Sequence, residues 1–480
     1  MKATKIVATL GPASDTVEII AAMIGAGCDV FRLNFSHGTA EDHMGRANRV
    51  REAATLMGRE VAIMGDLQGP KIRVGKFEGG KAWLEAGQPF LLDAALDNKA
   101  PVSNAQQASL DYKELPQDVK VGDTLLLSDG LIQLKVVRIS GDKVFTIVEL
   151  GGELSNNKGI NRLGGGLTAA ALTAKDMADI KTAVDIDCDY LAISFPKSAN
   201  DMQTARTILA AAGGKAKLIA KIERAEAIVP QTLDEIIDAS DGIMVARGDL
   251  AIEVGNAAVP ALQKRMIKRA RDRNKLTITA TQMMESMITA PVPTRAEVSD
   301  VANAVLDGTD AVMLSAESAT GKYPVETIRT MTAIALAAER SQVYELDSDF
   351  INQQFVRVDQ AIAMAALFTA FHLNVKAIAA LSQSGSTALW MSRHDSGVPI
   401  YALTPEVSAA RRAALYRGVR PVVVPFDSDR ENALMAAENA LKARGAVGDG
   451  DLIVLSCGEP MGKSGGTNAL KVVRVGELRA

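Results

Sequence analysis

Eight short apolar runs, most of them separated by segments with a helical pattern, constrain the fold more than any other feature of this sequence. Each run is six to eight residues long and rich in Val, Ile, Ala and Leu, as expected of strands that are buried on both faces. Helical patterns such as Val17–Ala26, Lys175–Asp185 and Leu262–Arg273 lie between them. This alternation predicts parallel strands joined by helices, and eight such units close an α/β barrel. The runs are Lys5–Leu10, Val30–Phe35, Val61–Leu67, Tyr190–Phe195, Lys217–Glu223, Gly242–Arg247, Thr277–Met283 and Asp310–Glu317.

Between the third and fourth runs the pattern changes for about a hundred residues. Hairpin-like segments, Thr124–Leu127 and Leu131–Ile139, flank the turn signal Ser128-Asp129-Gly130. Glycine or proline marks both crossings, at Gly69-Pro70 and at Gly164-Gly165-Gly166, and both are candidate hinges. We expect an all-β insertion that lies over the active face of the barrel as a lid.

A further α/β series begins after about Tyr344. Its strand candidates are Lys376–Leu381, Val398–Leu403, Pro421–Val424, Asp451–Ser456 and Leu470–Val475. The predicted fold is therefore α/β, a TIM (β/α)8 barrel with an inserted all-β lid domain and a C-terminal α/β domain. The predicted boundaries are 1–69 and 168–345 for the two parts of the barrel, 70–167 for the lid and 346–480 for the C-terminal domain.

The composition favours small-molecule partners. The 53 Lys+Arg nearly balance the 57 Asp+Glu, so no general field would attract nucleic acid or an acidic membrane. Cys28, Cys188 and Cys457 are too far apart for a disulfide framework or a Cys-x-x-Cys site, which indicates a reducing compartment. Because we find no membrane-length apolar run and no room for a signal peptide before the first strand, we expect a cytoplasmic protein.

Two neighbouring runs end in charged residues. One leads into Lys221-Ile222-Glu223 and the next into Arg247-Gly248-Asp249. The carboxyl ends of barrel strands share one face of the fold, so these side chains are expected to meet there. Glu223 and Asp249 offer the oxygen ligands of a hard cation such as Mg²⁺, and the four histidines have no zinc-like spacing. The alternative is a structural ion cluster.

Polar residues also follow other strands. Arg32, Asn34 and Ser36 alternate with apolar residues, and an arginine can clamp a phosphate; the alternative is a capped turn whose arginine bonds a barrel carboxylate. Asp66, Lys71 and Arg73 surround the first hinge, where such charges can also merely solvate a linker. Thr281 closes the seventh strand with a hydroxyl, which could instead cap the next helix. The residues from Asp249 onward could open a short helix whose free N–H groups bind a carboxylate.

Taken together, several long motifs closely resemble those of pyruvate kinase, and the resemblance covers essentially the whole chain. The family transfers the phosphoryl group of phosphoenolpyruvate to ADP, giving pyruvate and ATP in glycolysis. The motifs are Thr9-Leu-Gly-Pro-Ala-Ser14, Arg32-Leu-Asn-Phe-Ser-His-Gly38, Lys221-Ile-Glu223, Met244-Val-Ala-Arg-Gly-Asp-Leu250, Ala280-Thr-Gln-Met-Met-Glu-Ser286 and Pro293-Thr-Arg-Ala-Glu297.

The resemblance implies a role for each matching residue. Mg²⁺, with Mn²⁺ as a substitute, would be held by Glu223 and Asp249, while Lys221 and Arg32 would hold the transferring phosphoryl group. Thr281 would lie near the substrate carboxylate and the enolate carbon, and the backbone around Gly248 and Asp249 would bind the carboxylate. The positions that match the nucleotide site are Thr9, Pro12, His37, Arg73 and Lys197.

One departure from the family concerns the monovalent cation. Many members have Thr-Lys and then Glu where this chain has Leu67-Gln68 and then Lys71, and they need K⁺, which they bind beside Asn34, Ser36, Asp66 and the next carbonyl. Lys71 brings its own charge, and two cations about 4 Å apart would repel by about 4 kcal/mol at an effective dielectric of roughly 20. We therefore expect that K⁺ is not required.

The C-terminal domain contains a candidate effector loop, Ser382-Gln-Ser-Gly-Ser-Thr387, whose functional members would be Ser382, Ser384, Ser386 and Thr387. Hydroxyl and N–H groups at a helix start suit a phosphate, from either a sugar phosphate or AMP, although a capped helix without a ligand remains an alternative. The family also implies a regulated homotetramer. Two other functions stay open at this point: a different Mg²⁺-dependent barrel enzyme acting on phosphoenolpyruvate or pyruvate, such as an aldolase, and an inactive regulatory relative.

Overall fold

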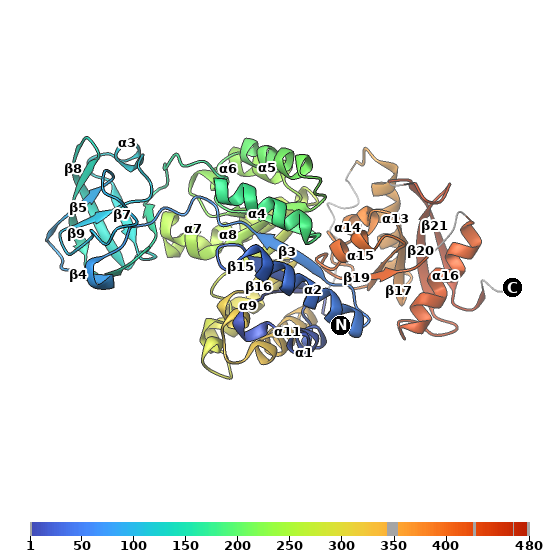
Figure 1. Cartoon of the computed structure of the whole chain (residues 1–480). Coiled ribbons are helices and arrows are strands. Elements are labelled where there is room, and N and C mark those ends of the chain that lie inside the picture. The colour runs from blue at the N-terminus through green and yellow to red at the C-terminus, as the bar shows by residue number, and fades with distance from the viewer. Residues whose placement is uncertain (1, 343–353, 426–428, 464, 478–480) are drawn as a thin grey trace.

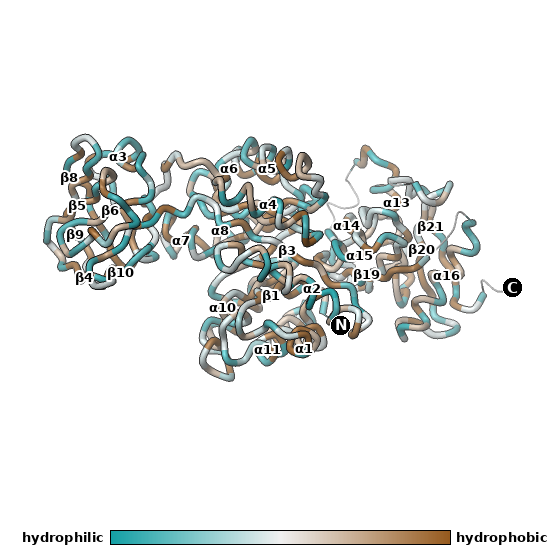
Figure 2. The backbone as a smooth tube through the Cα atoms, in the orientation of Figure 1, coloured by the Kyte–Doolittle hydropathy of each residue, from teal (hydrophilic) through white to brown (hydrophobic). Residues whose placement is uncertain are grey.

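The computed structural model describes residues 2–342, 354–425, 429–463 and 465–477. Three bodies follow one another in space: the β lid at one end, the barrel in the middle and the C-terminal domain at the other end (Figure 1). The predicted boundary between residues 345 and 346 lies outside the described residues, and the exact limits of the domains remain predictions. Hydrophobic stretches recur in all three bodies (Figure 2), because each contains a buried cluster.

The predicted TIM barrel is confirmed. Eight parallel strands close on themselves in the order β1-β16-β15-β14-β13-β12-β3-β2. Every one of the eight apolar runs supplies one strand. The strands are β1 (Lys5–Thr9), β2 (Val30–Asn34), β3 (Ala62–Asp66), β12 (Tyr190–Ile193), β13 (Lys217–Ile222), β14 (Gly242–Ala246), β15 (Leu276–Ala280) and β16 (Ala311–Leu314).

Helices surround the barrel and join its strands. The first begins after Thr16, whose side chain accepts a hydrogen bond from Ile19 N, and ends at Gly27, which has a φ of 118° that favours glycine. The α-helices are α1 (Val17–Ala26), α2 (Ala40–Leu56), α4 (Ala174–Asp185), α5 (Ala199–Ala211), α6 (Pro230–Ala239), α7 (Arg247–Val254), α8 (Val259–Asp272), α9 (Arg295–Leu306), α10 (Ala316–Ala319) and α11 (Pro324–Arg340). Short 3₁₀ turns are η1 (Pro12–Ser14), η3 (Glu226–Ile228), η4 (Asn256–Ala258) and η5 (Glu285–Ile288).

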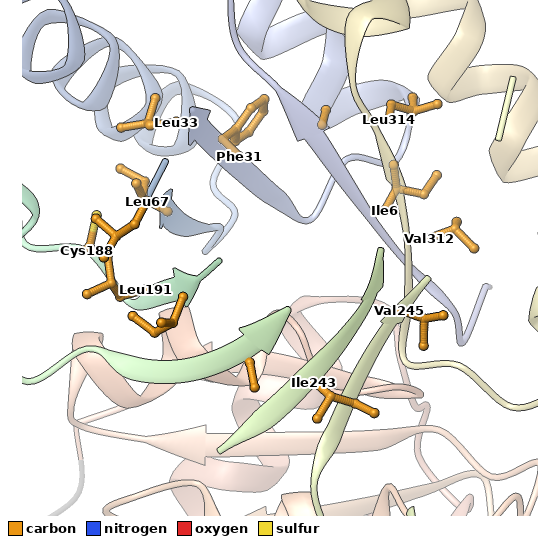
Figure 3. Packing of buried hydrophobic residues seen from close by; sticks show 14 of the residues in the cluster. Ile6, Phe31, Leu33, Leu67, Cys188, Leu191, Ile243, Val245, Val312 and Leu314 are labelled. Carbon is orange, nitrogen blue, oxygen red and sulfur yellow. The ribbon is translucent and has the colours of Figure 1, made fainter. Parts of the chain in front are cut away.

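The barrel strands bury both faces, as their continuous apolar sequences predict. Ile6, Phe31 and Leu314 belong to the cluster between the strands and the surrounding helices, part of which is shown in Figure 3. Val7 and Val30, one residue away on β1 and β2, belong to a different cluster. Because side chains alternate with a period of two, that second set fills the barrel interior.

The lid has two sheets and its own core. The predicted hairpin is present: β7 and β8 are antiparallel and meet at a turn in which Ser128, Asp129 and Gly130 all have positive φ. The insertion is built of β-sheets, as predicted, and contains in addition a single turn of α-helix at residues 115–118. The elements are η2 (Glu78–Gly80), β4 (Lys81–Leu84), β5 (Pro89–Asp93), β6 (Gln107–Ser109), α3 (Leu115–Asp118), β7 (Thr124–Leu127), β8 (Ile132–Ser140), β9 (Lys143–Leu150), β10 (Gly152–Ser155) and β11 (Ile160–Arg162).

The C-terminal domain is an α/β sheet in the order β19-β18-β17-β20-β21, parallel except for β21. It packs against the amino-terminal end of the barrel, where Arg393 Nη1 donates to Asp310 Oδ2 over 2.9 Å just before β16. The carboxyl ends of the barrel strands therefore face away from this domain. Its elements are α13 (Val358–His372), β17 (Ala377–Leu381), α14 (Ser386–Met391), β18 (Ile400–Thr404), α15 (Val407–Ala413), β19 (Val419–Val423), α16 (Arg430–Ala443), β20 (Leu452–Gly458) and β21 (Thr467–Arg474).

The helices of this chain can be compared with the length and hydropathy that a membrane-spanning helix requires. Within the four described ranges, none of them has both the length and the apolar character of a bilayer-spanning segment.

Candidate active site

On three barrel strands, the side chains that face the interior change from apolar to charged at the carboxyl end. On β2 the interior residue Val30 is followed two positions later by Arg32, and on β3 Met64 is followed by Asp66. The same spacing makes Lys221 the interior residue after Ile219 on β13. The period of the strand thus aims these charges into one barrel mouth.

Arg32 and Asp66 form a buried ion pair at this mouth. Arg32 Nε donates to Asp66 Oδ2 over 2.6 Å, and Arg32 Nη1 donates to Thr9 Oγ1 over 3.0 Å. Burial alone would raise the pKa of Asp66, but the positive charges of Arg32 and Lys221 outweigh it and hold this pKa below its usual value. Asp66 is therefore a fixed anion that orients the guanidinium.

Lys221 connects this pair to a second carboxylate. Its Nζ lies 3.3 Å from Asp66 Oδ1 and 3.0 Å from Glu223 Oε1, and donates to Ser194 Oγ over 2.7 Å. Burial would lower the pKa of Lys221, but Asp66 and Glu223 together raise it well above its ordinary value. The side chain is therefore a permanent cation.

Glu223 is almost completely buried, and its Oε2 accepts a hydrogen bond from Phe195 N over 2.8 Å. Burial is the main reason why the pKa of Glu223 rises to about 7; Lys221 lowers it, and the negative charge of Asp249 raises it further. Two carboxylates that repel each other in this way suit a divalent cation.

The protein itself provides only part of a metal site. Within the part of the chain that the structure describes, no group of three or more His, Cys, Asp or Glu side chains is arranged to hold an ion. Mg²⁺ is commonly held by one or two carboxylates together with substrate phosphates and water, so the Glu223 and Asp249 pair fits that ion.

Asp249 lies in the first turn of α7, directly after β14. Lys71 Nζ, from the segment that leads into the lid, is 3.6 Å from Asp249 Oδ1. The preceding residue, Gly248, donates its N–H to Thr281 Oγ1 over 2.8 Å. The ends of β14 and β15 and the start of the lid thus meet at one point.

Arg247, the first residue of α7, holds the loop after β15. Its Nε donates to Ala280 O over 3.2 Å, and its Nη2 donates to Thr281 O over 2.6 Å. Thr281 and Gln282 have φ values of 69° and 54°, a region in which residues other than glycine are strained. The guanidinium fork therefore stabilises a loop conformation that places the Thr281 hydroxyl against α7.

Comparison with known proteins agrees with this geometry. A family model described as the barrel domain of pyruvate kinase matches residues 1–328, and one described as its alpha/beta domain matches residues 360–473. The chain belongs to the pyruvate kinase family. It is accordingly an enzyme of the kinase, or phosphotransferase, class.

Curated relatives match it from end to end. Pyruvate kinase II of Salmonella typhimurium is 52% identical over 99% of both chains. Pyruvate kinase of Haemophilus influenzae is 51% identical over 95% of this chain and 96% of its own, and that of Staphylococcus aureus is 40% identical over 99% and 81%.

The five residues that match the family's nucleotide positions come from different parts of the molecule. Thr9 lies inside the mouth beside Arg32, whereas Pro12, at the start of η1, and His37, after β2, are exposed. Arg73 belongs to the lid, where its Nη1 donates to Asn157 O over 2.9 Å. Lys197 Nζ donates to Thr168 O over 2.9 Å, on the segment that returns from the lid.

The residues that match the family's monovalent-cation region are only partly together. Asn34 Oδ1 accepts a hydrogen bond from Ser36 N over 3.2 Å, and Asn34 is paired in register with Asp66 on the next strand. Leu67 O accepts a hydrogen bond from Ser194 Oγ over 2.7 Å. Lys71 forms its ion pair with Asp249 rather than with Asp66.

The predicted effector loop joins β17 to α14. Ser382 Oγ accepts a hydrogen bond from Gly385 N over 3.0 Å, and Ser384 Oγ donates to Ser386 Oγ over 3.1 Å. Thr387 is buried, and its hydroxyl is bonded to that of Thr467. Ser382 also lines a small pocket together with Lys463, which places a positive charge beside this loop.

Sequence reasoning missed one contributor to the site, Ser194, and the contacts of another, Arg247. Ser194, which binds Lys221, comes directly after β12 and two residues after the interior residue Ala192, so the strand period alone could have identified it. Arg247 stood in a recognised motif, but its role depends on the loop from β15, and no local pattern identifies that partner.

Proposed function

We propose that this chain transfers the phosphoryl group of phosphoenolpyruvate to ADP, giving pyruvate and ATP. The observation that carries the proposal is the connected charge set in the barrel mouth, in which Asp66 contacts both Arg32 and Lys221 and Lys221 contacts Glu223. Phosphoryl transfer requires alignment and charge neutralisation more than a nucleophile from the protein.

Arg32 and Lys221 bind the phosphoryl group as it moves. Because the Asp66 carboxylate contacts both cations, their N–H groups are oriented before the substrate arrives. Preorganised charges of this kind stabilise the transition state without the cost of reorientation.

Glu223 and Asp249 would hold Mg²⁺, or Mn²⁺ as a substitute. The ion supplies positive charge to the phosphate oxygens and helps to orient the substrate. The two carboxylates belong to neighbouring strands, since Glu223 follows β13 and Asp249 follows β14.

The substrate carboxylate is assigned to the start of α7. Backbone N–H groups of Gly248 and Asp249 lie in its first turn, where such groups lack helical partners and favour an anion. In this structure the Gly248 N–H donates to the Thr281 hydroxyl, so a bound carboxylate would share or replace that acceptor. Thr281 borders this position through its bond to Gly248. After transfer, the enolate takes its proton through solvent or through hydroxyl groups around Thr281.

ADP is assigned to the side of the mouth that faces the lid, with Thr9, Pro12, His37, Arg73 and Lys197 as its contacts. The support is that these residues come from barrel loops, from the lid itself and from the segment beside its second crossing.

Lys71 is proposed to make K⁺ unnecessary. Its ammonium group stands 3.6 Å from Asp249, so a fixed monovalent charge is already present beside the proposed metal ligand. A K⁺ ion bound nearby would be repelled by it.

Regulation is proposed to act through the loop Ser382–Thr387, with a sugar phosphate or AMP as the effector. A homotetramer and a cytoplasmic location belong to the same proposal and rest on the family and on the composition.

The test is the substitution Lys221→Met, assayed for ATP and pyruvate formation from phosphoenolpyruvate, ADP and Mg²⁺. We expect kcat to fall by about 10³-fold because one of the two fixed cations is lost. Lys217→Met is the matched control: Lys217 lies at the other end of β13, is paired with Asp241, and should leave kcat unchanged. Near-normal ATP formation by folded Lys221→Met would refute the assigned role.

A further inference from the structure

The chain returns from the lid to the barrel through three consecutive glycines. Gly164, Gly165 and Gly166 follow β11 and have φ values of 85°, 77° and 92°. Other residues rarely adopt this region, so the path of the crossing depends on glycine. Because a segment of three glycines bends easily, its position depends on the contacts that it makes with other parts of the chain.

Within the lid, Arg162 at the end of β11 accepts a hydrogen bond from Gly165 N and donates from Nη1 to Gly165 O over 2.9 Å. The other contacts come from the barrel. The Glu226 carboxylate accepts a hydrogen bond from Gly166 N through its Oε1. Its other oxygen, Oε2, is buried and has no hydrogen-bond partner among the described residues. A Cβ atom on Gly165 would lie 2.6 Å from that oxygen, so the carboxylate is pressed against the glycine backbone.

Neighbouring groups hold the crossing on both sides of Gly166. Gly164 N donates to Glu253 O over 3.0 Å. Arg224 Nη1 donates to Leu167 O over 2.8 Å. The crossing is therefore bound to two barrel segments, residues 224–226 and the end of α7.

The same two segments carry the proposed metal ligands. Glu226 follows Glu223 by three residues, and Glu253 follows Asp249 by four, which is one turn of α7. Glu253 Oε2 accepts a hydrogen bond from Ala225 N over 2.7 Å, which ties the two segments together. The crossing and both proposed metal ligands are therefore held by the same two barrel segments.

The first crossing into the lid has a comparable anchor. Gly69 N donates to Asp176 Oδ1 over 3.0 Å. Asp176 is also engaged in the capping box at the start of α4, so its carboxylate has a structural role of its own. Glu226 makes no such cap: η3 begins at Glu226, and no side-chain cap is formed there.

We propose that Glu226 is a positioning residue that fixes the lid relative to the metal carboxylates by holding the Gly164–Gly166 hinge. The proposal rests on the proposed function, because it assigns the lid to the nucleotide side of that reaction. Glu226 acts through the hinge and touches no substrate. Its loss broadens the range of lid positions, so the arrangement that binds ADP is less populated and the apparent affinity for ADP falls by the same factor.

The experiment compares Glu226→Ala, which removes the acceptor for Gly166 N, with Glu226→Gln, which keeps an oxygen at that position. In the full-length enzyme we expect Glu226→Ala to raise the KM for ADP about tenfold while the KM for phosphoenolpyruvate changes less than twofold, because Arg32 and Lys221 are untouched. Glu226→Gln should restore the KM for ADP. Glu235→Ala, on the exposed side of α6, is the matched control and should match the wild type.

Hydrogen exchange provides a readout that does not depend on catalysis. The peptide covering residues 163–170 should exchange about tenfold faster in Glu226→Ala and at the wild-type rate in Glu226→Gln, while the β20 peptide should not change in either. Gly165→Ala, which presses a methyl group against Glu226 from the other side, should give the same shift in the KM for ADP.

Unchanged exchange and an unchanged KM for ADP in Glu226→Ala would overturn the proposal. Equal rises in both KM values without rescue by Gln would do the same, because they indicate general damage. Failure of the proposed function is recognised separately: the wild type would then form no ATP, whereas the exchange difference would persist.

Discussion

At the scale of single residues, Asp66 determines the geometry of the barrel mouth more than any other side chain described above. It is fully buried, and its two oxygens contact the two cations that are proposed to bind the phosphoryl group. Burial of a carboxylate is unfavourable unless it is paired, and here two positive partners provide the compensation.

We predict that Asp66→Asn lowers kcat by about 10²-fold, because asparagine has nearly the same shape but cannot orient two cations by charge. Steady-state kinetics measures the effect, and circular dichroism checks the fold. Asp241→Asn, which removes a carboxylate paired with Arg206 and Lys217 at the opposite end of the barrel, should retain kcat. Full activity of Asp66→Asn would show that Arg32 and Lys221 need no such anchor.

The residues of this cluster differ in how far the sequence reveals them. Lys221 and Glu223 follow from a simple pattern, since an apolar strand that ends in charges presents them at the barrel face. The partner of Lys71 does not: the sequence places this residue beside the first hinge, and only the folded chain brings it to Asp249. Long-range pairings of this kind leave no local signal.

At the scale of elements, α7 contributes more residues and contacts to the site than any other helix described above. This eight-residue helix carries Arg247 and Asp249 in its first turn and Glu253 near its end. It thereby connects the loop after β15, the proposed metal ligands and the lid hinge.

We predict that Arg247→Lys lowers kcat/KM for phosphoenolpyruvate by about tenfold to a hundredfold, because a lysine lacks the planar fork that donates to Ala280 O, Thr281 O and the Asp300 carboxylate in fixed directions. The free energy of unfolding should fall by about 1–2 kcal/mol for the lost hydrogen bonds. Kinetics and chemical denaturation measure the two effects. Arg269→Lys, in an ion pair with Asp234 on the outside of the barrel, is the control for the substitution. Wild-type kcat/KM in Arg247→Lys would rule out its support of the Thr281 loop.

Secondary structure was predictable wherever the sequence pattern is periodic. All eight barrel strands and the 128–130 hairpin turn agree with the prediction, because continuous apolar runs and Asp-Gly turns are strong local signals. The turn α3 was missed, since its four residues are too few for a helical period. The function of Ser194 was missed although its position was predictable, because only its contact with Lys221 reveals a role.

At the scale of the whole molecule, the two ends of the barrel have different roles. Its carboxyl end carries the site and the lid, and its amino end packs on the C-terminal domain. Lys5 lies at this second end, where its Nζ donates to Val419 O over 2.5 Å beside a cavity of about 540 Å³. Burial, only partly offset by Asp29, lowers the pKa of Lys5 from 10.5 to about 8.

This shift predicts a pH dependence of stability. Between pH 8 and 10.5 the unfolded chain still binds the Lys5 proton while the folded chain has lost it, so stability gains with rising pH. The free energy of unfolding of the wild type, relative to Lys5→Met, should therefore rise by up to about 3 kcal/mol across this window. Denaturation at several pH values measures it, with the exposed Lys81→Met as the control. A constant difference between wild type and Lys5→Met would mean that Lys5 keeps an ordinary pKa.

The order of the three bodies could be inferred from the sequence, because each has its own pattern of apolar residues. The contacts between them could not: Arg393 and Asp310 are 83 positions apart, and nothing in either local sequence pairs them. The exact limits of the domains and the assembly of several chains also depend on surfaces that a single sequence does not specify.

The most direct test of the proposed function is the initial rate of pyruvate and ATP formation from phosphoenolpyruvate, ADP and Mg²⁺ in potassium-free buffer, before and after K⁺ is added. We predict full activity before the addition and no further rise afterwards. Activity that appears only with K⁺ would support the proposed kinase activity but contradict the proposal that Lys71 makes K⁺ unnecessary. Folded protein without activity in either buffer would contradict the account and favour a different barrel enzyme or a regulatory relative.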